Sequence, residues 1–309
     1  MVGCTQQKSR LRPAAQAAWW TSLILAGLSL ASSPAAALEK YGRPLPSMDG
    51  PESNGQEQES LFSGYLLSAA FPYNPTFAAR PDNTGLVGLR HMIHLETNLY
   101  KDYLQFYTDQ NFFSDRKNGW IELSEWDGTY AFTGSIDRWS WRLQYERDAG
   151  LDRRTIVQEY ADVLVTGRFV AIQDSAWWRR TFPQQNLTAY AGAGWLFHNH
   201  NYFARPDNTG TALFRYVAHA DLDLYKNKLV LYADANLFSD REASNNLNPT
   251  ELDWIIGLAV RWRDYEFAVY QEEDRPLDRP GLIQKYVAIQ LRYSFDVPRS
   301  LLKRLSPRG

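Results

Sequence analysis

The chain has 309 residues, a formal net charge of −2 and a single cysteine, Cys4. Its charged residues are scattered through nearly every segment and form no basic block, which excludes the usual pattern of a nucleic-acid-binding protein. Cys4 lies before the first apolar run and is lost if that run is removed, so we expect no disulfide in the mature chain.

The N-terminal region is predicted to be an export signal. Basic residues at positions 8, 10 and 12 precede an apolar run at 17–30 and a group of small residues at 35–37. This order is typical of a secretory signal peptide, so residues 1–37 are predicted to be a cleaved signal peptide. An uncleaved anchor is the alternative, although the run is shorter than the ~20 residues of a spanning helix. Residues 38–59, rich in proline and polar side chains, are predicted to be a flexible lead.

The rest of the sequence contains an internal repeat. Arg-Pro-Asp-Asn-Thr-Gly at 80–85 recurs at 205–210, and Phe-Ser-Asp-Arg at 113–116 recurs at 238–241. Both matches have an offset of 125, which becomes 126 further along the chain. A period this long indicates a duplicated half-domain rather than an array of short repeats.

From residue 60 onward, apolar side chains recur at every second position, as expected for strands with two different faces. In the segment 228–238, for example, leucine and alanine occupy one face, whereas aspartate and asparagine lie on the other. The pattern predicts strands at about residues 60–70, 86–99, 103–114, 122–136, 139–148, 158–169, 187–198, 211–224, 228–238, 250–262, 265–273 and 284–295.

The predicted connections alternate between very short and long. The short ones lie at residues 100–102, 137–138, 225–227 and 263–264, and the remaining connections are longer. The joint at 171–186 breaks this alternation and contains Trp177 and Trp178. It is either an interfacial segment with its indoles among lipid headgroups or a plain linker.

Long strands, alternating loops and apolar outward faces such as Ile256, Leu258 and Val260 together resemble the bacterial outer-membrane β-barrel class over residues 60–295. The resemblance implies an all-β fold, a transmembrane antiparallel up-and-down barrel of about 12 strands built from an internal duplication. It also implies a Gram-negative source, location in the outer membrane among its lipids, and assembly by the barrel-insertion machinery. A water-soluble β-sandwich is the alternative fold.

The corresponding division of the chain has three parts after the signal peptide. The lead at 38–59 is followed by a barrel at 60–295, whose halves at 60–170 and 187–295 are connected by the joint. Residues 296–309 form a basic tail, which the resemblance places in the periplasm together with the N-terminus.

The inward faces carry the candidate site. If the short turns are centred as predicted, His94 faces Asp109 across two strands, and His219 faces Asp234 in the second half. The predicted lumen residues are Arg90, His94, Glu96, Asp109, Arg215, His219, Asp221 and Asp234. These groups either form a network that fills and stiffens the barrel, line a path for solutes, or perform metal binding or acid/base chemistry.

The Phe-Ser-Asp-Arg repeat places Asp115 with Arg116, and Asp240 with Arg241, at the outer ends of two strands. These residues are predicted to form rim salt bridges, with gating of the barrel mouth as the functional alternative. The Arg-Pro-Asp-Asn-Thr-Gly repeat is interpreted as a turn-forming sequence, with a calcium or ligand contact from Asp82 and Asp207 as the alternative.

Inward acidic residues outnumber inward arginines, which favours a narrow pore for small cations or neutral polar solutes. The alternatives are a non-conducting membrane anchor or interaction protein, and an outer-membrane lipid-modifying hydrolase that uses His198 or His200. A non-enzymatic role is favoured over the hydrolase. No catalytic residue, metal ligand or cofactor is assigned, and small solutes and membrane lipids are the expected partners.

Overall fold

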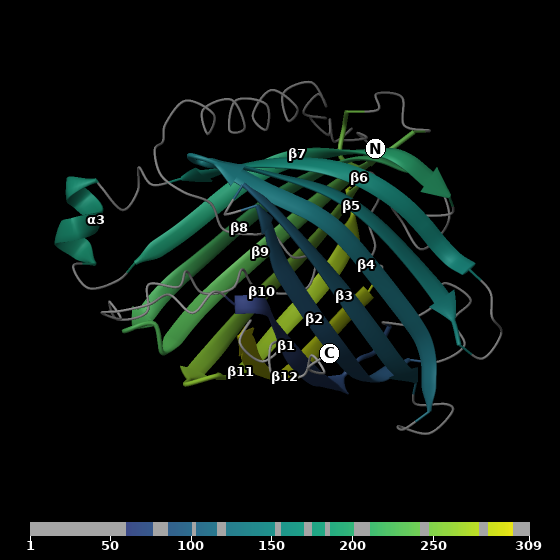
Figure 1. Cartoon of the computed structure of the whole chain (residues 1–309), viewed down its shortest axis with the longest axis horizontal. Helices are drawn as coiled ribbons and strands as arrows, with labels where there is room; N and C mark the ends of the chain where they lie inside the picture. The colour runs from purple at the N-terminus through teal and green to yellow at the C-terminus, as the bar shows by residue number, and fades with distance from the viewer. Residues whose placement is uncertain are drawn as a thin grey trace, which may run out of the picture.

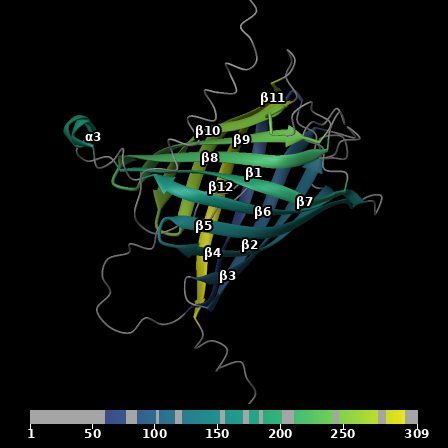
Figure 2. The ribbon, with the colours of Figure 1, turned by 90° about the horizontal axis from the view of Figure 1, so that it is seen from above.

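The chain forms a closed barrel of twelve antiparallel strands in which each strand pairs with its neighbours in sequence and β1 pairs with β12 (Figure 1). The computed structural model describes residues 60–76, 86–100, 103–115, 122–151, 156–169, 175–182, 186–200, 211–241, 247–277 and 284–298. Figures 1 and 2 show the strands tilted, so that the front and back walls cross in projection. Tilted strands are required for a sheet to close on itself.

The strands are 12 to 15 residues long, which is enough for a tilted strand to cross a bilayer. Their bounds are β1 Ser60–Tyr73, β2 Val87–Tyr100, β3 Leu104–Asp115, β4 Leu123–Ile136, β5 Trp139–Gly150, β6 Ile156–Phe169, β7 Leu187–His200, β8 Ala212–Tyr225, β9 Leu229–Asp240, β10 Glu251–Trp262, β11 Tyr265–Pro276 and β12 Gln284–Pro298.

Side chains alternate between a buried inner face and an exposed outer face. In β5, Ser140, Arg142 and Gln144 are buried, whereas Leu143 between them is exposed. The same alternation continues around the barrel and exposes Phe132, Ile256 and other large apolar side chains on the outside. A polar interior with an apolar exterior reverses the arrangement of a water-soluble domain and suits a lipid surround.

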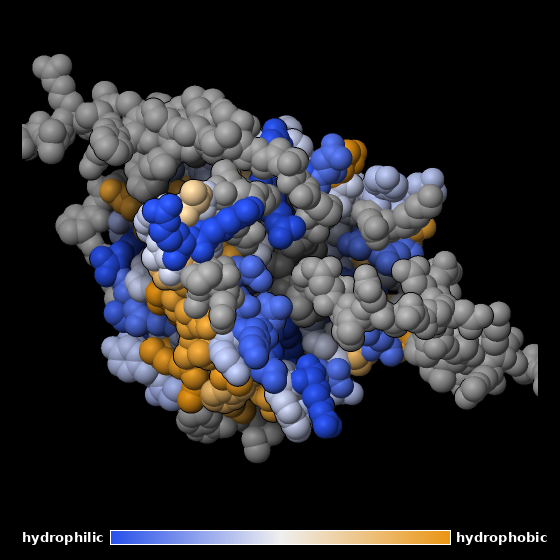
Figure 3. Space-filling model, turned by 90° about the vertical axis from the view of Figure 1, so that its left-hand side faces the viewer, coloured by the Kyte–Doolittle hydropathy of each residue, from blue (hydrophilic) through white to orange (hydrophobic). Residues whose placement is uncertain are grey.

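Aromatic residues gather at the end of the barrel that carries the short turns. Tyr100, Tyr103, Tyr225, Trp262 and Tyr265 are all exposed there. Basic side chains lie over two of these rings, Lys226 over Tyr225 at 5.6 Å and Arg263 over Trp262 at 5.0 Å. Such a girdle is typical of the membrane–water interface. On the face drawn in Figure 3, hydrophobic residues form a continuous patch bordered by hydrophilic ones.

The short turns hold their strands in register through left-handed backbone conformations. Lys226 and Asn227 between β8 and β9 have φ of 46° and 55°, which matches the tight hairpin turns that follow the sheet twist. The backbone N–H of Asn227 donates to the carboxylate of Asp223 at 2.8 Å. Asp137 and Arg263 have similar φ values in the two-residue turns between β4 and β5 and between β10 and β11.

The joint between the halves contains a short helix, α3 (Ala176–Thr181), which sequence periodicity did not predict. Ser175 caps it by accepting a hydrogen bond from the backbone N–H of Trp178. Trp177 is exposed and Trp178 is buried, with their rings 6.2 Å apart. Within the described residues, no helix is long and apolar enough to span a membrane.

The predicted fold class is confirmed: the protein is an all-β, closed antiparallel barrel of twelve strands. Several strands extend two or three residues beyond their predicted ends, notably β1, β11 and β12. Origin by duplication stays an interpretation of the sequence repeat. The signal peptide, the lead, both Arg-Pro-Asp-Asn-Thr-Gly segments and residues 299–309 lie outside the described residues.

Candidate functional site in the barrel interior

A histidine–carboxylate cluster lies on the inner faces of β2 and β3. His94 is directly opposite Asp109 in the strand register, as the turn position predicted. Its Nδ1 lies 2.7 Å from Oδ1 of Asp109, and its Nε2 lies 3.6 Å from Oε2 of Glu96. The imidazole thus bridges two carboxylates inside the wall, and both contacts strengthen if it is protonated.

The second half repeats this cluster on β8 and β9. His219 is opposite Asp234, with Nδ1 2.6 Å from Oδ1, and its Nε2 lies 3.5 Å from Oδ1 of Asp221. Both predicted pairs therefore form, with the same ring nitrogen toward the opposing aspartate.

Each histidine also stacks on a tyrosine from the preceding strand. Tyr65 of β1 lies parallel to His94 with ring centroids 4.6 Å apart, and Tyr190 of β7 lies over His219 at 4.7 Å. The tyrosines are related by the same offset of 125 as the histidines. Sequence reasoning did not identify them, although extending the repeat alignment back into the first strands would have done so.

Arginine–asparagine pairs lie next to the histidine clusters. Arg90 Nε donates to Oδ1 of Asn111 at 2.8 Å, and Arg215 Nε donates to Oδ1 of Asn236 at 2.9 Å. The guanidinium of Arg90 also lies 5.9 Å from the ring centre of Phe113. Asparagine on the inner face thus orients a buried cation without neutralising it.

The two halves differ in the interior side chains of β5 and β6 and of the corresponding strands β11 and β12. Arg142 in β5 lies 3.7 Å from Asp162 in β6, and both are buried. The positions 126 residues later are Ala268 and Ala288, also buried. This part of the interior is charged in the first half and apolar in the second.

The middle of the barrel is closely packed. Four apolar or aromatic side chains are almost fully buried there: Tyr65, Leu67, Tyr160 and Tyr270. Arg90, Arg142 and Arg215 are buried as well. Tyr160 donates a 2.7 Å hydrogen bond to Glu146, and Tyr286 donates to Glu272 at the matching position. Any path for solutes must therefore pass between ordered, hydrogen-bonded side chains.

A charge network lies near the short-turn end of the inner face. Across the β10–β11 turn, Arg261 Nε lies 2.9 Å from Oε2 of Glu266, and Arg292 Nη2 lies 3.2 Å from the same oxygen. This is a buried carboxylate shared by two guanidinium groups.

The predicted rim residues are only partly described. Asp115 and Asp240 are buried at the ends of β3 and β9, and Arg241 is exposed. Arg241 Nη2 donates to the carbonyl of Leu196 at 3.3 Å. Arg116 lies outside the described residues, so rim pairing and gating stay predictions.

His198, the histidine considered for a hydrolase, lies near the end of β7 that leads into a long connection. His198 of β7 has its Nε2 3.7 Å from Oε1 of Glu159, and its side chain is 54% exposed. This is a surface histidine–carboxylate contact; a nucleophile is also needed for acyl-transfer chemistry.

A closed antiparallel barrel with an apolar outer face, an aromatic girdle and alternating short and long connections defines the bacterial outer-membrane β-barrel class. The chain has the fold of this class, as its sequence pattern predicted.

Comparison with known proteins adds no narrower assignment. No family model matches the chain, and no curated protein matches it. Among solved structures, a KdgM porin is 7% identical with a TM-score of 0.44, covering 75% of this chain and 99% of that one. LpxR from Salmonella typhimurium is 9% identical with a TM-score of 0.42, over 75% of this chain and 100% of that one. A NanC porin is 8% identical with a TM-score of 0.39, over 76% of this chain and 100% of that one.

Proposed function

We propose that this barrel is a narrow pore for small cations or neutral polar solutes. The observation that supports it most directly is the accessibility of three inward carboxylates. The side chains of Glu96, Asp221 and Asp234 are 19%, 17% and 27% exposed although they face the barrel interior. Water that reaches these groups from inside the wall marks where a polar path would run.

The charge of the inner face sets the expected selectivity. Carboxylates outnumber arginines there, and several arginines are already engaged, as Arg261 and Arg292 are by Glu266. The surplus negative charge raises the local concentration of cations and repels anions.

The packed middle of the barrel sets the expected size limit. A twelve-stranded barrel encloses less space than the sixteen- or eighteen-stranded general porins. Tyr65, Tyr160 and Tyr270 reduce that space further. We therefore expect small conductance steps and exclusion of solutes larger than a monosaccharide.

The same packing supports a second candidate, a non-conducting anchor whose interior serves stability alone. The buried Arg142–Asp162 pair and the tyrosine–glutamate hydrogen bonds would suit that role.

Two measurements on the reconstituted mature chain separate these candidates. Planar-bilayer recording tests for discrete conductance, and liposome swelling tests for passage of neutral solutes graded by size. Discrete steps with uptake of only the smallest sugars would support the pore. The absence of both conductance and swelling, in protein shown to be folded, would overturn it and favour the anchor.

A further inference from the structure

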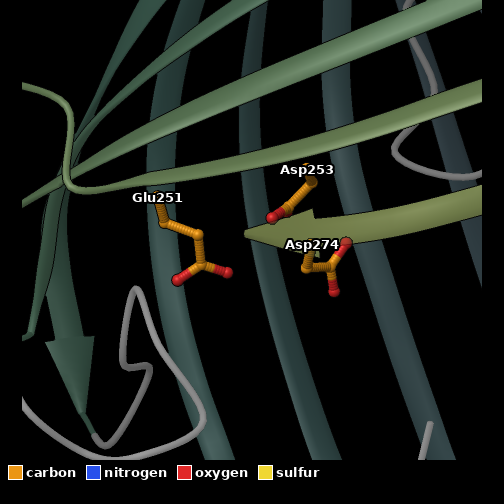
Figure 4. A group of neighbouring side chains, drawn as sticks. All are labelled: Glu251, Asp253 and Asp274. Atoms are coloured by element: carbon orange, nitrogen blue, oxygen red, sulfur yellow. The ribbon is translucent and has the colours of Figure 1, made fainter. Parts of the chain in front are cut away.

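Three carboxylates converge on the inner face, at the end of the barrel that carries the long connections. They are Glu251 and Asp253 of β10 and Asp274 of β11 (Figure 4). One carboxylate oxygen from each lies within 4.8 Å of the others. Asp253 and Asp274 are directly opposite each other in the strand register.

This arrangement is unfavourable without a counter-charge. Like charges directly opposite on adjacent strands repel each other, and a buried carboxylate needs hydrogen bonds or an opposite charge. Asp274 is 2% exposed, and within the described part of the chain its Oδ1 accepts no hydrogen bond. Two nearby cations, Arg275 and Lys285, pair with Glu273, the adjacent residue in sequence. A third, Arg215, donates to Asn236, which is directly opposite Asp253.

The geometry and chemistry of the cluster suit a hard divalent cation. Calcium binds carboxylate oxygens at about 2.3–2.6 Å, so oxygens on opposite sides of one ion are separated by about 4.6–5.2 Å. The spacing in the cluster is compatible with a shared ion. Calcium also tolerates irregular ligand geometry and retains water molecules, whereas magnesium requires a near-ideal octahedron.

The same three residue types recur in the first half at an offset of 126. Glu125 and Asp127 of β4 match Glu251 and Asp253, and Asp148 of β5 matches Asp274. Asp127 is directly opposite Asp148, as Asp253 is opposite Asp274. The cross-strand acidic pair is therefore a repeated element of the barrel design.

We propose that Glu251, Asp253 and Asp274 form a calcium site at the outer mouth that ties β10 to β11. The site does not depend on conduction and would exist equally in a pore or an anchor. Because the described part of the site supplies three carboxylates, we expect a dissociation constant on the order of 10⁻⁴–10⁻³ M, as in extracellular calcium modules.

Calcium titration of the folded mature barrel tests the site by isothermal calorimetry and by the temperature of unfolding in detergent. The wild-type protein should bind calcium in preference to magnesium and unfold at a higher temperature with calcium than with chelator. Asp274→Asn should weaken calcium binding by about tenfold or more, because a direct ligand matters at least as much as the groups that orient ligands. Asp296→Asn, an exposed aspartate at the opposite end of the barrel, is the matched control and should leave binding unchanged.

The stability of Asp274→Asn in chelator and in calcium shows whether Asp274 is a metal ligand or has a purely structural role. In chelator the variant should be at least as stable as the wild type, since it removes a like-charge contact, whereas in calcium it should lose the stabilisation. Asp253→Asn provides the same test if Asp274→Asn does not fold. An identical calcium response in the wild type and both variants, or no calcium response in the wild type, would overturn the proposal.

Discussion

The imidazole of His94 lies 2.7 Å from the carboxylate of Asp109 across two neighbouring strands, and His219 lies 2.6 Å from Asp234 at the corresponding place in the other half. Both contacts occur between directly opposed residues on the inner face. A one-residue slip of either hairpin would move one partner to the lipid side, so each pair also reports the strand register.

The pair in the first half should show measurable coupling. His94→Gln and Asp109→Asn should each destabilise the barrel by about 1–3 kcal/mol, because each leaves a buried polar partner less well satisfied. The double variant should be less destabilised than the sum of the singles, by at least about 0.5 kcal/mol. Urea unfolding of the three variants in lipid vesicles measures this difference, and strictly additive values would contradict a direct interaction.

A second prediction concerns the charged pair that the second half lacks. In the wild type, the guanidinium of Arg142 lies 3.7 Å from the buried carboxylate of Asp162. Arg142→Met removes this counter-charge and should lower the free energy of unfolding by about 3–5 kcal/mol. Combining it with Asp162→Ala should recover stability, because the matching positions in the second half are Ala268 and Ala288. Equilibrium unfolding measures both variants. A double variant less stable than Arg142→Met would show that Asp162 is stabilised by other partners.

Gln110 is a polar residue on the lipid-facing surface, and its hydrogen bonds give a third prediction. Gln110 accepts a 2.8 Å hydrogen bond from the indole of Trp126 and donates to Thr108 at 2.7 Å, so its amide is satisfied on the outer face. Trp126→Phe removes the indole donor and should destabilise the barrel by about 1–3 kcal/mol.

Replacing both residues should restore much of that loss. Gln110→Leu in the Trp126→Phe background removes the amide that lost its partner and places an apolar side chain toward lipid. Heat-dependent mobility in gel electrophoresis gives the unfolding temperature of both variants. An unfolding temperature that falls further in the double variant would rule out this account.

Strand positions and register followed from local information. Period-two alternation located the strands, and the compact turn near residue 101 fixed the opposition of His94 and Asp109. Neither inference needed contacts between distant parts of the chain.

Features that depend on three-dimensional packing were missed. Asp274 was overlooked because its strand was predicted to end at 273, whereas β11 continues to Pro276. The stacking of Tyr65 on His94 requires the pairing of β1 with β2 across a long connection. The helix α3 is too short to show a helical period and is marked mainly by its cap at Ser175.

The reversal potential across a planar bilayer under a potassium chloride gradient tests the proposed cation-favouring path through the barrel interior. The wild type should favour potassium over chloride. Asp234→Asn, which removes a partly accessible inward carboxylate, should reduce that preference, whereas Asp296→Asn should leave it unchanged. A reversal potential that favours chloride, or a preference that Asp234→Asn does not alter, would contradict the proposed path.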